Sequence, residues 1–294
     1  MSKKVLLSDS GPEISNSVYS FWRWQNQEDL TIEKVSEILS FALSLGVNAF
    51  DVSPLYGNGK IEVLVGQAIQ NLKINRENIV IFSKISIKKP NSEGNFNYQA
   101  LNDKNIQIQI EASLENLKTD YIDVLLIDGF DPLMNVELVA STLTGLQLRE
   151  KIKHIGVSDF NVQQHKLLAS RLSSEIVTNH FELNLLQIDA LKDGRIDFIK
   201  ENYSKPMAFG PLADGRILTG QDEKALKIRS YLEELSKKYN SNIEQLAVAW
   251  IYKLGALPII GSLSKERIQN AASASEINLS YEDWHLIYDL IQKV

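Results

Sequence analysis

Two stretches decide the fold: Asn48-Ala-Phe-Asp51-Val-Ser-Pro-Leu-Tyr56-Gly57 and Ile79-Val-Ile-Phe-Ser-Lys84. Each contains a short apolar run, residues 47–50 and 79–82, that closes near an ionisable side chain. Residues 60–72 lie between them and have the apolar spacing of an amphipathic helix. A buried strand, a helix and a second buried strand form the unit from which parallel sheets are built, so this region predicts an α/β fold.

The same alternation continues along the chain. Apolar runs that predict strands cover residues 18–22, 47–50, 79–82, 124–127, 154–157, 175–178, 206–209 and 257–260. Amphipathic stretches that predict helices cover residues 31–45, 60–72, 103–117, 134–148, 162–171, 187–201, 223–239, 243–254 and 265–274, and one more helix opens at Ser280. This pattern over 294 residues predicts a (β/α)8 TIM barrel that forms a single domain, residues 1–294.

A doubly wound sheet is the alternative, but that fold normally opens with a glycine-rich phosphate turn after its first strand. Gly11-Pro12 and Gly57-Asn-Gly59 do not supply such a turn. Two local predictions accompany the barrel. Ser241-Asn-Ile-Glu predicts a capping box at a helix start. Residues 88–102, the longest stretch without a pattern, predict a loop on the catalytic face.

Composition narrows the functional class. The net charge of −6 disfavours a general nucleic-acid-binding role, which requires a basic surface. The chain has no cysteine, which excludes disulfides, thiolate nucleophiles and cysteine-ligated metals, and no metal site is predicted. No apolar stretch approaches the roughly 18 residues of a membrane span, and the first residues lack a signal-peptide core. We therefore expect a soluble cytoplasmic protein.

Ionisable residues follow the predicted strands where an active site would lie. Side chains at the carboxyl ends of barrel strands point into the catalytic mouth, and Asp51, Tyr56 and Lys84 occupy such positions. Tyr56 is a candidate proton donor, because a neighbouring cation lowers the cost of forming phenolate. Asp128, at the end of Ile122-Asp-Val-Leu-Leu-Ile-Asp128, adds a further carboxylate at the matching position.

The sequence resembles the aldo-keto reductases along essentially its whole length. The segments that carry the resemblance are Phe50-Asp-Val-Ser-Pro-Leu-Tyr-Gly57, Lys84, Thr119-Asp-Tyr-Ile-Asp-Val-Leu-Leu-Ile127, Ile155-Gly-Val-Ser-Asp-Phe160, and Leu257-Pro-Ile-Ile-Gly-Ser262 with Glu266-Arg-Ile268. Asp131-Pro-Leu-Met134 is similar to a bacterial oxidoreductase branch of that family.

The resemblance implies hydride transfer from a nicotinamide cofactor, usually NADPH, to the carbonyl carbon of an aldehyde or ketone. It makes Tyr56 the proton donor, tuned by Lys84, which Asp51 holds. The cofactor-binding positions that it implies are Ser158, Asp159, His180, Phe209, Leu212, Ser262, Arg267 and Asn270. Trp22 and Trp24 are the implied walls of the substrate pocket.

Several positions depart from the family pattern. Asp128 stands at the catalytic histidine, and Asp159 and His180 stand where an asparagine and a glutamine hold the carboxamide. An ionised Asp128 would raise the pKa of Tyr56 and oppose reduction, whereas a protonated one could donate to the developing oxyanion. For Asp159 and His180 we hypothesise a direct contact, which would raise the pKa of the histidine.

At the adenosine end, Gly261 replaces a lysine and Ala271 replaces an asparagine, with Asn270 adjacent to it. Lys265 is a candidate source of the missing charge. These departures leave two functions open: an NADP(H)-dependent carbonyl reductase, or a cofactor-binding barrel with little turnover that serves as a sensor or partner subunit. Fold alone does not separate them, but the retained Asp51, Tyr56 and Lys84 favour the enzyme.

Overall fold

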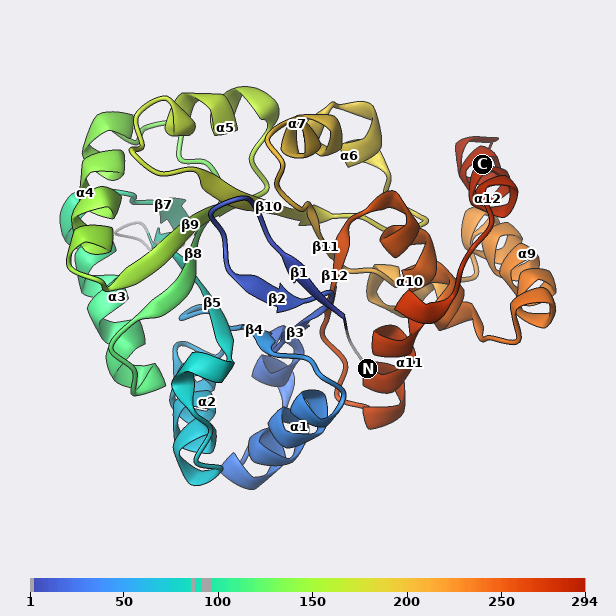
Figure 1. Cartoon of the computed structure of the whole chain (residues 1–294), viewed down its shortest axis with the longest axis horizontal. Helices are drawn as coiled ribbons and strands as arrows, with labels where there is room; N and C mark the ends of the chain where they lie inside the picture. Colours follow the sequence, from blue (N-terminus) through green and yellow to red (C-terminus); the bar gives the residue numbers. More distant parts are fainter. Residues whose placement is uncertain (1–2, 86–87, 91–96, 294) are drawn as a thin grey trace.

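The computed structural model describes residues 3–85, 88–90 and 97–293. Its centre is a closed parallel barrel in the order β10-β11-β12-β3-β4-β5-β8-β9, which confirms the predicted (β/α)8 architecture (Figure 1). The barrel strands are β3 (Val18–Ser20), β4 (Ala49–Asp51), β5 (Val80–Ile85), β8 (Ile122–Asp128), β9 (Ile152–Ser158), β10 (Ile176–Glu182), β11 (Met207–Phe209) and β12 (Leu257–Ile260).

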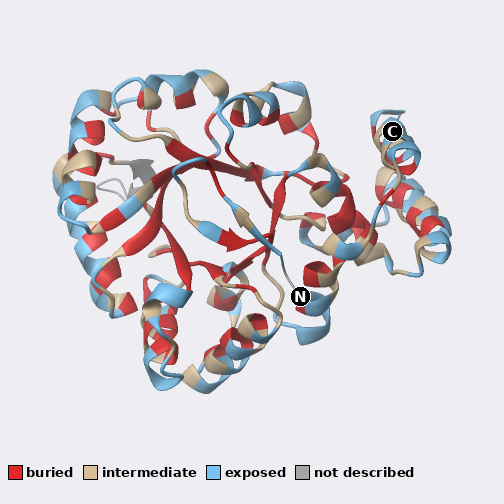
Figure 2. Ribbon diagram, viewed as in Figure 1, coloured by how far each residue is buried: buried red, intermediate tan, exposed pale blue. Residues whose placement is uncertain are grey.

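Helices surround the barrel, with α9 and α12 packed against each other at one side of it (Figure 2). They are α1 (Ile32–Ser44), α2 (Lys60–Asn71), α3 (Asp103–Leu117), α4 (Val136–Leu148), α5 (Val162–Ala169), α6 (Asp189–Lys192), α7 (Arg195–Glu201), α8 (Arg216–Thr219), α9 (Glu223–Tyr239), α10 (Ile243–Leu254), α11 (Lys265–Ser273) and α12 (Tyr281–Lys293). Within the described part of the chain, no helix has the length and apolar character needed to cross a bilayer.

Alternation along the strands separates the barrel interior into an apolar filling and a polar top. Successive side chains of a strand point to opposite faces, so β5 directs Val80, Phe82 and Lys84 inward. Val80 and Phe82 belong to the buried cluster that fills the barrel, and the next inward position is charged. Strand β8 shows the same change from apolar to charged side chains toward its carboxyl end. Val124 and Leu126 lie in that cluster, and Asp128 is the next position on the same face.

A hairpin that the sequence patterns did not predict closes the other end of the barrel. It consists of β1 (Lys4–Leu6) and β2 (Glu13–Ser15) and crosses the barrel opening in Figure 1. Leu7 and Ile14 are fully buried in the barrel cluster. The hairpin therefore seals the amino ends of the strands, which leaves the carboxyl ends for a site.

Other local predictions need correction. The region predicted as a loop, 88–102, contains the short antiparallel strands β6 (Lys88–Pro90) and β7 (Asn97–Gln99), while its residues 91–96 lie outside the described part. The helix predicted over 187–201 is divided into α6 and α7 by Gly194, whose φ is +81°. Helix α8 was not predicted either.

The predicted capping box starts one residue later than expected. Asn242, not Ser241, caps α10: its side chain accepts from the backbone N–H of Gln245, and the Gln245 side chain accepts from the backbone of Asn242. Asparagine caps a helix as well as serine does, so the choice between neighbouring residues depends on where the helix packs.

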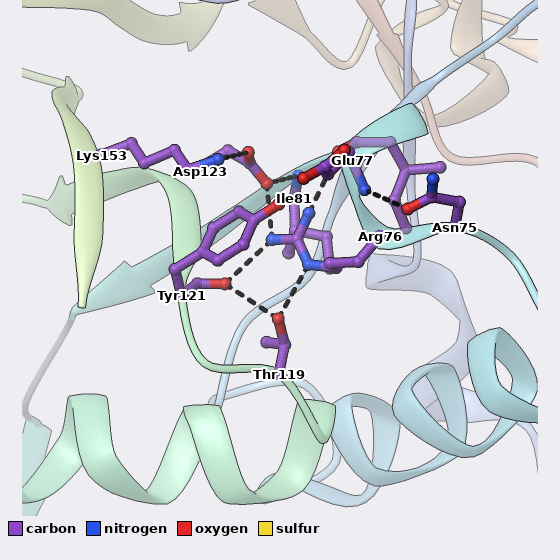
Figure 3. A network of polar contacts seen from close by, with 9 residues as sticks. Asn75, Arg76, Glu77, Ile81, Thr119, Tyr121, Asp123 and Lys153 are labelled. Carbon is purple, nitrogen blue, oxygen red and sulfur yellow. Dashed lines mark hydrogen bonds and ion pairs between the residues drawn. The ribbon is translucent and has the colours of Figure 1, made fainter. Parts of the chain in front are cut away.

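The amino ends of β5 and β8 are joined by a network centred on Arg76 (Figure 3). Its guanidinium donates to Thr119 Oγ1 at 2.9 Å and to the backbone oxygens of Ile79 and Tyr121 at 3.1 and 2.9 Å. It also donates to Asp123 Oδ2 at 2.6 Å. The guanidinium carbon lies 4.1 Å from the centroid of the Tyr121 ring. These contacts fix the start of both strands whose far ends carry Lys84 and Asp128.

Candidate active site

Four side chains from three neighbouring strands and one loop meet at the polar top of the barrel. Lys84 Nζ donates to the hydroxyl of Tyr56 at 2.7 Å, and that hydroxyl donates to Asp51 Oδ2 at 3.0 Å. Lys84 Nζ also lies 3.4 Å from Asp51 Oδ1. Ser20 Oγ donates to Asp51 Oδ2 at 2.6 Å. The predicted grouping of Asp51, Tyr56 and Lys84 is thus present as one contacting cluster, to which the structure adds Ser20.

Local backbone structure brings Tyr56 back over the strand ends. After β4 the chain turns, with the Tyr56 N–H donating to the Ser53 carbonyl at 3.0 Å. Gly57 and Gly59 follow with φ of +60° and +82°, a backbone conformation that glycine adopts without steric cost. Helix α2 starts immediately afterwards. The Tyr-Gly pair therefore places the phenol beside the lysine of the next strand.

The environment holds Tyr56 in its protonated form. Burial and the Asp51 carboxylate raise the pKa of Tyr56 above its usual value, and Lys84 opposes them. Burial lowers the pKa of Lys84, but Asp51, Tyr56 and Asp128 outweigh it, so that the pKa of the lysine is raised. The cation predicted beside the phenol is present, and the cluster as a whole favours neutral phenol beside ammonium. The proton therefore stays on Tyr56 in this arrangement, and the Lys84 ammonium is placed to stabilise the phenolate when a proton is transferred.

Asp128 acts electrostatically on two neighbouring side chains, Lys84 and Asp159. It ends β8 in register with Ser158 and is partly exposed. Its charge raises the pKa of Lys84 and that of Asp159, whereas the charges acting on Tyr56 come from Asp51 and Lys84. A direct effect of Asp128 on the phenol stays a prediction, whereas its charge does act on Lys84, the residue that contacts Tyr56.

The expected side-chain contact between Asp159 and His180 is not formed. The two residues share only a backbone hydrogen bond, in which the N–H of Asp159 donates to the His180 carbonyl at 2.7 Å. The φ of Asp159 is +55°, its side chain is 51% exposed, and its carboxylate lies 3.9 Å from Arg195 Nη1. Burial and the charge of Asp128 raise the pKa of Asp159, although the charge of Arg195 opposes this rise.

His180 instead points into the barrel. It is buried, its ring centroid lies 5.6 Å from that of Phe82, and neither ring nitrogen has a hydrogen-bond partner among the described residues. Burial and the charge of Lys84 hold the pKa of His180 well below its usual value. This reverses the expected rise in pKa. A neutral imidazole with one N–H donor and one acceptor nitrogen is thus available beside the cluster.

The two tryptophans after β3 differ. Trp22, in the turn η1 (Trp22–Asn26), is 40% exposed, which is compatible with a place at the rim of the mouth. Trp24 is buried and donates from Nε1 to the Tyr19 hydroxyl at 2.9 Å. Its ring packs near Phe21 at 6.1 Å, so Trp24 belongs to the packing behind the site. Its role as a wall of a substrate pocket stays a prediction.

The remaining predicted positions lie at the ends of β11 and β12. Phe209 is half-buried at the end of β11 and packs on the barrel cluster, and Leu212 packs between two core clusters. The carbonyl of Ser262 accepts from the Tyr19 hydroxyl at 2.8 Å. A single chain of hydrogen bonds therefore links Trp24, Tyr19 and the segment after β12.

Arg267 and Asn270, both on α11, share a partner that sequence reasoning missed. Glu244, in the first turn of α10, accepts from Arg267 Nε at 2.5 Å and from Asn270 Nδ2 at 3.3 Å. Lys265, the candidate for the missing charge, donates to Glu37 at 2.6 Å instead. Ser20 could have been found from the alternation of β3, but nothing in the sequence pairs Glu244 with Arg267.

Comparison with known proteins gives concordant results. The family model described as "Aldo/keto reductase family" matches residues 20–292. The oxidoreductase YdhF of Escherichia coli (strain K12) is 32% identical over 291 residues, which covers 98% of this chain and 97% of that protein. A 6-dehydroglucose reductase of Agrobacterium fabrum is 29% identical, with 98% and 97% covered. The solved structure of the thermostable aldo-keto reductase Tm1743, in complex with the inhibitor epalrestat, superposes with a TM-score of 0.86 at 26% identity and covers 98% of this chain and 99% of that one.

Proposed function

Because the chain belongs to the aldo/keto reductase family, we propose that it is an NADP(H)-dependent oxidoreductase that reduces an aldehyde or ketone to an alcohol. The observation that carries the proposal is the buried contact of Lys84 Nζ with the Tyr56 hydroxyl at 2.7 Å, beside Asp51. A phenol held protonated next to an ammonium ion is suited to general-acid catalysis of carbonyl reduction.

The residues at the top of the barrel suit a nicotinamide cofactor, which supplies the hydride. The neutral His180 offers a donor and an acceptor nitrogen, both without partners among the described residues, and a primary carboxamide requires that combination. Ser158 and Asp159 lie beside His180, and Phe209 and Leu212 would flank the ring. Ser262, Arg267 and Asn270 are the residues that would hold the adenosine end.

In the proposed reaction, each residue of the cluster has a separate task. Tyr56 donates its proton to the oxygen of the substrate. Lys84 stabilises the phenolate that this leaves, which lowers the barrier for donation. Asp51 fixes the lysine, and Ser20 fixes Asp51 through the 2.6 Å hydrogen bond. Asp51 keeps Lys84 charged, and Asp128 contributes to the same rise in its pKa.

Among carbonyl compounds, we propose polyhydroxylated aldehydes as the first class to examine. Asp128 and Glu182 end β8 and β10, and Asp159 directly follows β9, which lies between those two strands in the barrel. Asp128 and Glu182 also both raise the pKa of Asp159. Carboxylates accept hydrogen bonds from sugar hydroxyls. The 6-dehydroglucose reductase of Agrobacterium fabrum, similar over 98% of this chain, supports the same choice.

The proposal is tested by measuring cofactor binding and turnover on the same preparations. NADPH binding is followed through quenching of tryptophan fluorescence, and NADPH oxidation is measured with a panel of simple and polyhydroxylated aldehydes, 6-dehydroglucose included. We expect Tyr56→Phe to bind NADPH like the wild type and to lose roughly 10²–10⁴-fold in turnover, the usual cost of removing a general acid. Binding without turnover in the wild type would instead support the sensor or partner-subunit reading. Turnover in Tyr56→Phe close to that of the wild type would exclude Tyr56 as the donor.

A further inference from the structure

Glu244 occupies an unusual place at the adenosine end of the proposed cofactor site. Only 14% of its side chain is exposed, and its carboxylate binds Arg267 Nε at 2.5 Å through one oxygen and Asn270 Nδ2 at 3.3 Å through the other. It thereby engages both α11 side chains that the resemblance assigns to the cofactor. Arg267, 44% exposed, is turned toward a carboxylate of its own chain.

The surroundings of this pair are acidic. A surface cavity of about 550 Å³ lies here, lined by Leu218, Glu233, Glu244, Ser264 and Arg267, among others. Lys265 is held away by Glu37 at 2.6 Å, with its ammonium 5.5 Å from the Phe41 ring centroid. Position 261 is glycine. Arg267 is therefore the cation on the cavity wall, and it is already paired.

The two nicotinamide cofactors differ only at this end of the molecule. NADPH carries an anionic 2′-phosphate, which an arginine binds through charge-assisted hydrogen bonds. NADH carries a 2′-hydroxyl, which can donate a hydrogen bond to a carboxylate. A 2′-phosphate must compete with Glu244 for Arg267 and is repelled by that carboxylate, whereas a 2′-hydroxyl meets an acceptor. Within this pair, Arg267 thus favours NADPH, whereas Glu244 disfavours NADPH and favours NADH.

We infer that Glu244 determines the cofactor preference of this protein by competing with the 2′-phosphate for Arg267, so that NADPH and NADH are both accepted. The inference rests on the proposed nicotinamide-dependent function. It assigns to Glu244 a specificity role rather than a catalytic one, and Ser262 and Arg267 would confer a stronger preference for NADPH if Glu244 were absent.

The test measures binding without turnover. The affinities of 2′,5′-ADP and 5′-AMP are determined by isothermal titration calorimetry for the full chain and for Glu244→Gln, which keeps the shape of the side chain and removes its charge. We expect the preference for 2′,5′-ADP over 5′-AMP to rise by about tenfold or more in Glu244→Gln, equivalent to about 1.4 kcal/mol. Melting temperatures of both proteins check that α10 remains folded.

Matched variants separate the proposed competition from a general change of charge. Glu233→Gln removes one negative charge from the wall of the same cavity without a contact to Arg267, and we expect less than a twofold change in preference. In the double variant Glu244→Gln/Arg267→Met, the gain should disappear. An unchanged preference in Glu244→Gln, or an equal gain in Glu233→Gln, would overturn the inference and leave the proposed function intact. If the wild type and Glu244→Gln bind neither nucleotide, the placement of the cofactor itself fails, and the inference with it.

Discussion

The opposite ends of β5 and β8 carry two cation–carboxylate clusters that are built differently. At the amino ends, the Arg76 guanidinium is bonded to Asp123, a hydroxyl and two backbone carbonyls, and Asp123 also accepts from the Ile81 N–H at 2.9 Å. At the carboxyl ends, Lys84 has Tyr56 and Asp51, while the nearby His180 has two ring nitrogens without partners among the described residues.

This difference separates a structural network from a candidate catalytic one. Buried polar groups in proteins are normally satisfied, and those that are not deserve an explanation. In the Arg76 network the guanidinium holds strand ends and loops together (Figure 3), and the Tyr121 hydroxyl is its one buried group without a hydrogen-bond partner among the described residues. The Lys84 cluster keeps buried groups that a ligand can satisfy, and it keeps an acid whose proton can leave. The following predictions test whether the two clusters separate stability from chemistry.

The largest expected effect is that of Lys84→Met on turnover. We expect a loss of roughly 10²–10⁴-fold, comparable to loss of the general acid itself, because no cation then stabilises the Tyr56 phenolate. Stability also falls, since Asp51 is left as a buried carboxylate without its ion-pair partner. The double variant Lys84→Met/Asp51→Asn should recover much of the stability and none of the activity, as seen by chemical denaturation and steady-state kinetics. If the double variant recovered activity along with stability, the Lys84 cluster would be structural, like the Arg76 network.

Next in size is the effect of Arg76→Met on folding. We expect a loss of about 3 kcal/mol in the free energy of unfolding, near the lower end for breaking a buried pair, because 18% of the Arg76 side chain reaches solvent. Turnover per folded molecule should stay within about twofold of the wild type, as expected for a residue remote from the chemistry. Arg76→Lys is the matched control, because it keeps the charge but lacks the planar fork. Its free energy of unfolding should lie between those of the wild type and Arg76→Met. A large drop in turnover of the folded protein would contradict the structural assignment.

A smaller effect concerns the acid side of the stability profile. Burial lowers the pKa of His180 well below its usual value and that of His165 to about 4. The unfolded chain therefore takes up protons below about pH 6.5 that the folded protein does not, and stability falls as the pH decreases, by up to about 1.4 kcal/mol per pH unit for each histidine. His180→Gln and His165→Gln should each flatten the profile measured by urea denaturation at several pH values. NADPH should change the profile further only where His180 is present, because His165 packs against Phe198 on the outer helices.

The smallest expected effect is that of Asp128→Asn on its neighbour Asp159. Burial and the charge of Asp128 raise the pKa of Asp159, so removing that charge should lower it. Carboxyl-carbon NMR of aspartate-labelled protein across the acid range measures the shift directly. Glu137→Gln, an exposed carboxylate paired with Arg171 on the outer helices, serves as the control and should leave Asp159 unchanged. An Asp159 titration unaffected by Asp128→Asn would remove the electrostatic link between these two residues at the mouth.

Much of the fold and the grouping of Asp51, Tyr56 and Lys84 could be predicted because both depend on short sequence periods. Apolar runs that alternate with amphipathic helices locate the barrel strands, and strands of a closed parallel barrel bring their carboxyl ends together. Asp51 and Lys84 end two neighbouring strands, and the glycines after Tyr56 turn the chain back toward them. No long-range information was needed to predict that these three residues meet.

The hairpins, the direction of individual side chains and the partners of charged groups required the tertiary structure. Asp159 follows β9 and His180 lies on the adjacent strand β10, yet the Asp159 carboxylate lies near Arg195, whereas the His180 ring packs on Phe82 inside the barrel, so the two side chains do not pair. Glu244 and Arg267 lie on different helices and meet only because α10 packs beside α11.

Sequence by itself therefore determined which strands form the barrel and which residues end them. Only the tertiary structure decided which charges are paired and which buried nitrogens are left for a ligand. The physical reason is that periodicity is a local property of the backbone. The state of a polar group depends instead on every element packed around it.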